Sequence, residues 1–198
     1  LIHTDAAKVI PMLRHIALEP ANLAAARRAV FVLAQSRNPA AHTTVVDVAK
    51  IGPEPVRLVA VRELARFGGA KASEDLLQVY SSGNLPVKQQ VIVALGDRAE
   101  TAALVKIAQS EHDRRIRDGA IIALGRAGGT RQLRVMYRDS PIEARHTIIR
   151  GLFSARDEEG LIRIASEEAN TELRREVLTR LRLLGTPGAK AYLEKVSK

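Results

Sequence analysis

Apolar residues recur along this chain with a period of about thirty residues. Leucines stand at six corresponding positions, at intervals of 31, 31, 29, 28 and 29 residues: Leu33, Leu64, Leu95, Leu124, Leu152 and Leu181. Apolar residues precede each of them by eight, four and three positions, as Ile116, Ala120 and Ile121 precede Leu124. These intervals place the side chains on one face of an α-helix, whereas a strand would alternate. The pattern predicts six related helices, here called B helices, within 26–35, 57–66, 88–97, 117–126, 145–154 and 174–183.

Start and stop signals lie at fixed distances from the leucines. Eleven residues before them stand Asn22, Pro53, Asn84, Asp113, Pro141 and Asn170. Asn and Asp side chains accept hydrogen bonds from the free N–H groups of a first helical turn, so helices are expected to begin there. Ser140 and Glu143 enclose Pro141 in a pattern that predicts a capping box with proline as the first helical residue. Left-handed C-cap glycines are expected four residues after three of the leucines: Gly68, Gly128 and Gly185.

A shorter segment with helical periodicity lies between successive B helices, and we call these segments A helices. Leu76, Val79 and Tyr80 mark one of them, and a further helix is predicted over residues 4–17. One helical pair cannot bury both apolar faces, so neighbouring pairs must stack into a continuous core. The prediction is an all-α solenoid of about six helical hairpins, forming a single domain over 1–198. The start at Leu1 and the unpartnered first helix favour a fragment of a longer chain.

The composition indicates which side chains form the core and excludes sites that depend on cysteine. Hydrophobic residues make up 46% of the chain but aromatic residues only 3%, so the core is aliphatic. The absence of cysteine excludes disulfides, thiolate zinc sites and cysteine nucleophiles. No apolar run approaches the ~18 residues of a membrane span, and no secretory signal is visible. The compartment, cytoplasmic or exported, is left open.

The net charge of +9 and a pI near 10.3 first indicate a nucleic-acid partner. However, one repeat position, seven residues before the leucine, carries a basic residue in five repeats: Arg57, Lys88, Arg117, Arg145 and Arg174. A charge repeated in the first turn of B helices indicates a structural hydrogen-bond ladder between repeats. Setting these five residues aside leaves a net charge of +4, which is ordinary.

The segment from Ile116 to Gly125, with its basic residue, small residue and Leu-Gly pair, resembles a HEAT repeat. It is more similar to the short bacterial variant called HEAT-like or PBS-lyase-type. This resemblance covers essentially the whole chain. It implies a right-handed α-solenoid with A helices on the convex side and B helices on the concave side, and a protein-binding scaffold. Phe153 and Arg182 depart from the pattern, because most repeats have a small residue after the leucine.

This sequence lacks the residues that known classes of enzymes with such repeats use for catalysis. The di-iron hydroxylases with HEAT-type repeats carry His-Glu ligand pairs, and this chain has none. The HEAT-like DNA glycosylases use aromatic residues, Trp included, around an Asp, and Trp is absent here. A bilin-lyase-like protein stays an alternative without a confirming motif. Glu111, His112 and Asp113 form one dense group of possible ligands, but Asp113 is the expected helix cap. We predict no catalytic, cofactor-binding or metal-binding residues.

The B-helix columns that lie off the core face are the expected binding groove. Arginine alternates there with apolar residues, a composition enriched at protein interfaces. The candidate partner-binding residues are Arg27, Phe31, Arg62, Arg66, Val93, Ile122, Arg126, Arg150 and Arg175. The expected partner is a peptide or protein segment of acidic character. Nucleic-acid binding by the basic surface is the alternative, which the scarcity of aromatic stacking residues disfavours.

Overall fold

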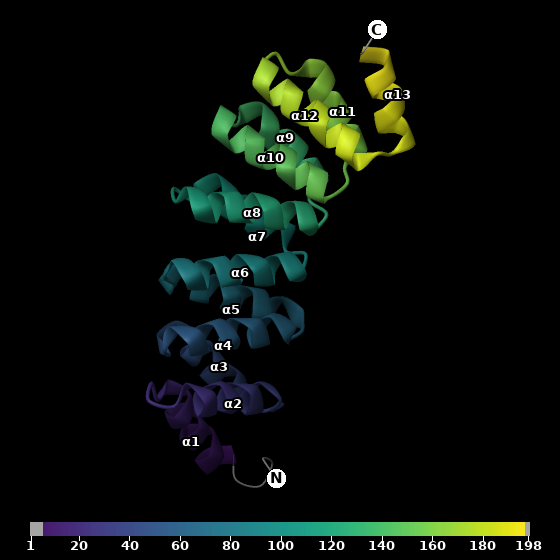
Figure 1. Cartoon of the computed structure of the whole chain (residues 1–198). Coiled ribbons are helices and arrows are strands. Elements are labelled where there is room, and N and C mark those ends of the chain that lie inside the picture. The colour runs from purple at the N-terminus through teal and green to yellow at the C-terminus, as the bar shows by residue number, and fades with distance from the viewer. Residues whose placement is uncertain (1–5, 197–198) are drawn as a thin grey trace. The chain divides into compact units, whose positions relative to one another are not determined.

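The computed structural model describes residues 6–196, and within that range it consists of helices joined by short turns (Figure 1). The helices are α1 (Ala6–Leu18), α2 (Leu23–Ala34), α3 (Pro39–Ile51), α4 (Glu54–Arg66), α5 (Gly69–Ser82), α6 (Leu85–Asp97), α7 (Thr101–Ser110), α8 (Arg114–Arg126), α9 (Thr130–Asp139), α10 (Ile142–Ser154), α11 (Glu158–Glu167), α12 (Thr171–Leu184) and α13 (Pro187–Val196). The prediction of an all-α chain is thus confirmed for the described residues. Residues 4 and 5 of the predicted first helix lie outside them.

The chain divides into two compact units, residues 1–98 and 99–198. In the first unit each odd-numbered helix packs against the following even-numbered one, and α4 packs between α2 and α6 (Figure 1). In the second unit α7 pairs with α8, α9 with α10 and α11 with α12, while α10 contacts both α8 and α12. Helices α2, α4, α6, α8, α10 and α12 are the predicted B helices.

The leucine column is the centre of both cores. All six leucines are at most 1% exposed: Leu33, Leu64, Leu95, Leu124, Leu152 and Leu181. Residues eight, four and three positions earlier in α8, Ile116, Ala120 and Ile121, are buried as well. In α8 the apolar side chains predicted as core by their helical spacing therefore form it. Polar residues are buried between core positions at Glu63 in α4 and Thr147 in α10.

Four of the predicted N-caps are confirmed. The side chains of Asn22, Asn84, Asp113 and Asn170 each accept a hydrogen bond from a backbone N–H in the first turn of the following helix. The capping box at Pro141 is wrong, because Pro141 occupies the N-cap position and makes no side-chain cap. Ser140 belongs to the end of α9, where its hydroxyl donates to the Met136 carbonyl at 2.7 Å.

The predicted left-handed stops hold at Gly185 (φ 67°) and Gly128 (φ 80°) and fail at Gly68. Gly68 is extended, and Gly69 takes the positive φ at the start of α5. The guanidinium of Arg98 explains the difference. It donates to the carbonyls of Ala65 (3.1 Å) and Phe67 (2.5 Å), so a side chain from the end of α6 satisfies the C-terminal carbonyls of α4. A left-handed residue at Gly68 is then unnecessary.

Two glycines bring α8 and α10 into backbone contact. Gly125 is buried, and a Cβ atom there would lie 2.5 Å from the Gly151 carbonyl oxygen. A Cβ at Gly151 would meet the Leu133 side chain at 3.1 Å and the Ile121 carbonyl oxygen at 3.2 Å. The small residue after Leu124 thus sets how closely these two B helices pack.

Candidate protein-binding surface

The repeated basic position has a structural role at two places. In α4, the Arg57 guanidinium donates to the Ala49 carbonyl near the end of α3 at 3.0 Å. In α10, Arg145 donates to the carbonyls of Ser140 (2.9 Å) and Arg138 (3.0 Å) at the end of α9. Both arginines therefore satisfy carbonyls at the C-terminus of the preceding A helix. These bonds lie within one helical hairpin and not between repeats as predicted; Arg145 also reaches the next repeat through Glu168, at 3.3 Å.

The other basic positions of this column behave differently. The Lys88 ammonium lies over the Tyr80 ring, 4.9 Å from its centroid. Arg117 lies 3.9 Å from the Asp118 carboxylate. Arg174 is exposed and makes no side-chain hydrogen bond among residues 6–196, so the ladder prediction is wrong there. Arg57 and Arg145 thus have a structural role that Arg174 lacks.

In the first unit the predicted binding residues lie on the outer face of the B helices. Arg27, Arg62 and Arg66 are exposed, and the two apolar members, Phe31 and Val93, are 50% and 45% exposed. This B-helix surface of the first unit thus combines cations with apolar area. Both are needed to hold an acidic, partly apolar peptide.

A hollow of about 240 Å³ lies on this surface between α4 and α6. It is lined by Arg62, Ala65, Arg66, Gln90, Ala94 and Asp97. Arg66 is paired with the almost buried carboxylate of Glu63 at 3.2 Å, whereas Arg62 makes no ion pair within the described residues. Arg62 is therefore the cation that this hollow offers to a ligand.

In the second unit the predicted residues come from α8, α10 and α12. Arg126, Arg150 and Arg175 are exposed, and no acidic group of residues 6–196 pairs with them. Ile122 differs from the prediction in degree, because its side chain is half-buried. These guanidiniums have no acidic partner, whereas those of Arg57 and Arg145 donate hydrogen bonds to backbone carbonyls.

A network that the sequence did not reveal joins α10 and α12 beside these arginines. The His146 ring nitrogen Nδ1 lies 2.5 Å from the Glu176 carboxylate, which also pairs with Arg180 at 3.4 Å. The Arg180 guanidinium lies over the Phe153 ring at 5.3 Å. Phe153, which departs from the small residue of other repeats, thus supplies an aromatic face for a cation.

Buried carboxylates also connect A helices. In the first unit Asp75, 2% exposed, binds the His42 ring at 2.6 Å and the Lys71 ammonium at 2.8 Å. Burial alone would raise the pKa of Asp75, but the hydrogen bonds from His42 and Lys71 outweigh burial and lower it.

In the second unit Glu168 has the same role after α11. It accepts from the Tyr137 hydroxyl at 2.6 Å and from the Asn170 N–H at 2.8 Å, and pairs with Arg145 at 3.3 Å. Burial would raise the pKa of Glu168, but these hydrogen bonds and the Arg145 charge hold it below its ordinary value. Burial and the bond to Glu168 raise the pKa of Tyr137.

Tyr137→Phe should lower the free energy of unfolding by about 1.5 kcal/mol at neutral pH, because the hydrogen bond from Tyr137 to the charged Glu168 carboxylate is lost. The loss stays moderate because Arg145 and Asn170 still bind this carboxylate. Glu168 has a lowered pKa in the folded state, so its contribution is present above the unfolded pKa of about 4.3 and is lost as pH falls through the folded value. Urea unfolding from pH 7 down to pH 3 should show the two proteins converging on acidification. A gap that stays constant over this range would contradict the assignment.

Compared with known proteins, the chain matches no family model and shows no significant sequence similarity to a curated protein. None of the helices within residues 6–196 combines the length and the apolar character that crossing a membrane requires. The same residues contain no group of three or more His, Asp or Glu side chains placed to hold a metal ion.

Proposed function

We propose that this chain is a HEAT-like repeat scaffold that binds an acidic, partly apolar peptide or protein segment on its B-helix surface. In this proposal the helical hairpins form a right-handed solenoid with the B helices on the concave side, and the protein has no enzymatic activity. The observation that carries it is the exposed, unpaired arginines of the B helices, which alternate with exposed apolar side chains such as Phe31 and Val93.

The test is binding of a fluorescein-labelled peptide rich in Glu and Leu, followed by fluorescence polarisation. The double variant Arg62→Glu with Arg150→Glu changes one B-helix arginine in each unit and should weaken binding about tenfold or more, because attraction becomes repulsion. A peptide with Gln in place of Glu should bind weakly to the unchanged protein. Helical circular dichroism should be the same for all variants, because both side chains are exposed.

The matched control is Arg37→Glu with Arg131→Glu, which makes the same change in net charge at exposed sites away from the B-helix face. It should bind the acidic peptide nearly as well as the unchanged protein. Equal losses in the two double variants would show that overall charge, and not the B-helix surface, holds the peptide. Undiminished binding by Arg62→Glu with Arg150→Glu would contradict the proposal directly.

Nucleic-acid binding is the second candidate, favoured by the net charge of +9 and by the same unpaired arginines. It requires that a labelled single-stranded oligonucleotide binds at low salt and is released steeply as salt rises, with a log–log slope of about −0.7 per phosphate contact. No binding at low salt would dismiss it. The near absence of aromatic side chains removes the stacking that such sites ordinarily use.

A further inference from the structure

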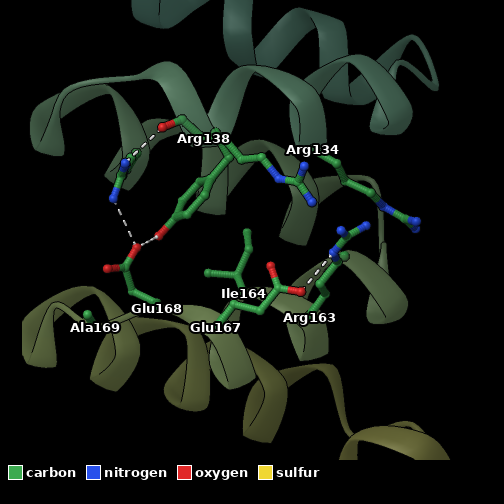
Figure 2. A pocket seen from close by; sticks show the side chains of 10 residues that line it. Arg134, Arg138, Arg163, Ile164, Glu167, Glu168 and Ala169 are labelled. Atoms are coloured by element: carbon green, nitrogen blue, oxygen red, sulfur yellow. Dashed lines mark hydrogen bonds and ion pairs between the residues drawn. The ribbon is translucent and has the colours of Figure 1, made fainter.

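A second hollow, of about 310 Å³, lies between the A helices α9 and α11 of the second unit (Figure 2). Its lining combines four arginines, Arg134, Arg138, Arg145 and Arg163, and two glutamates with a wall formed by Tyr137 and Ile164. None of these residues belongs to the B-helix surface proposed above. The volume lies within the ~300–1,000 Å³ of small-ligand sites.

Two of the four arginines are held by the protein. Arg145 is bonded to two carbonyls and to Glu168, as described above. Arg134 makes a two-pronged contact with Asp157, with its Nε atom 2.7 Å from Oδ2, and also pairs with Glu159 at 2.9 Å. These two guanidiniums are therefore committed to partners within the protein.

The other two arginines are available. The Arg138 side chain is exposed and has no acidic partner among residues 6–196. Arg163 pairs with Glu167 at 3.1 Å one helical turn away, but both side chains are about half exposed (51% and 59%), so the pair is weak and a ligand can compete for the guanidinium. Figure 2 shows Arg138 and Arg163 reaching from facing helices toward the same end of the hollow.

A hollow at the corresponding place between α7 and α9 shows that this lining is not a property of the repeat. It has a similar volume, about 330 Å³, but its charged residues are Arg117 against Glu111 and Asp139. The stacking of A helices therefore produces the cavity in both places. The lining between α9 and α11 differs because it carries four arginines, of which Arg138 has no acidic partner among the described residues.

We propose that the hollow between α9 and α11 binds a phosphate monoester carried on a compact apolar body. Arg138 and Arg163 would hold the phosphate, because its oxygens accept the paired N–H groups of two guanidiniums at once. Asp157, Glu159 and Glu168 offset the charges of Arg134 and Arg145, so the positive charge offered to the dianion is that of Arg138 and of Arg163, whose exposed pair with Glu167 is weak. The Tyr137 ring and Ile164 would contact the apolar body, since the Tyr137 hydroxyl is already committed to Glu168.

The experiment is calorimetric titration of the full chain with phenyl phosphate at low salt. Arg138→Gln with Arg163→Gln should weaken binding about tenfold or more, because two charge-assisted contacts are lost. The control Arg131→Gln with Lys190→Gln removes the same charge at exposed sites that do not line the hollow and should bind within about twofold of the unchanged protein. The B-helix variant Arg62→Glu with Arg150→Glu should also retain binding, so this site and the proposed peptide surface fail or succeed separately.

Three ligand arms define the chemistry. Phenol should not bind, inorganic phosphate should bind more weakly than phenyl phosphate, and affinity for phenyl phosphate should fall as pH drops below its second pKa of about 6. No heat with phenyl phosphate, or equal losses in the two Gln double variants, would overturn the proposal. Inorganic phosphate binding as tightly as phenyl phosphate would overturn the part assigned to Tyr137 and Ile164. Thermal unfolding of each variant checks that the comparison is made on folded protein.

Discussion

Leu124→Ala should lower the free energy of unfolding by about 2–5 kcal/mol, since truncating a buried leucine removes apolar burial and leaves a cavity. Leu124 is fully buried in α8, which packs between α7 and α10 in the second unit. Urea denaturation followed by circular dichroism measures the change. The m value should be unaffected if the same surface is exposed on unfolding.

The matched comparison is Leu33→Ala in α2, which tests whether the repeat of α1 and α2 frays: a smaller cost than at Leu124 is expected if this repeat opens on its own. Leu33 is itself only 1% exposed, so burial alone does not predict a difference. In a stack of repeats, stability is a sum of intrinsic and nearest-neighbour contributions. Identical costs at Leu33 and Leu124 would instead favour cooperative unfolding of a single globular unit.

Gly125→Ala should cost about 3 kcal/mol, at the upper end of the range for overpacking a core. The added methyl group would lie 2.5 Å from the Gly151 carbonyl oxygen, and backbone cannot rotate away as a flexible side chain can. Helices α8 and α10 would have to separate, which weakens their whole contact. Thermal or urea unfolding of the full chain measures the loss.

Gly119→Ala is the control in the same helix, because no heavy atom lies within 4 Å of a Cβ placed there. Alanine is the better helix former by about 1 kcal/mol, so this variant should be more stable than the unchanged protein. The two glycines of α8 should therefore shift stability in opposite directions. A stabilising Gly125→Ala would show that α8 and α10 do not pack through this glycine.

Much of the fold was predictable because the same apolar spacing and the same kinds of helix cap recur in successive repeats. The buried leucines and the caps at Asn22, Asn84, Asp113 and Asn170 follow from helical spacing and local hydrogen bonding alone. The errors at Ser140–Glu143 and Gly68 have different physical origins. At Gly68 the local pattern does not reveal Arg98, a residue from the next helical pair that bonds to the C-terminal carbonyls of α4. At Ser140–Glu143 the residue that caps α10 is Pro141, while the Ser140 hydroxyl donates back to the Met136 carbonyl.

The sequence predicted which residues of the candidate surface are exposed, but it did not predict the hydrogen bonds between side chains of neighbouring repeats. Outward columns of a helix follow from periodicity, so the exposure of Arg62 and Arg150 was within reach. The hydrogen bonds between repeats were missed, although they carried a signal. Their partners lie about one repeat apart in the sequence: His42 and Asp75, Tyr137 and Glu168, His146 and Glu176, and Asn84 and Glu54. The hollow between α9 and α11 depends on side-chain conformations that no sequence interval reports.

These bonds between neighbouring repeats also make the repeats non-interchangeable. Tyr137 finds its acceptor only in the repeat that carries Glu168, and a Cβ at Gly151 would meet Leu133 and the Ile121 carbonyl of the preceding repeat. Excising one hairpin or exchanging two of them would keep every leucine in register yet bring mismatched side chains together. The contacts between neighbouring hairpins therefore fix the order of the repeats. A designed array that is longer or shorter should keep adjacent hairpins together.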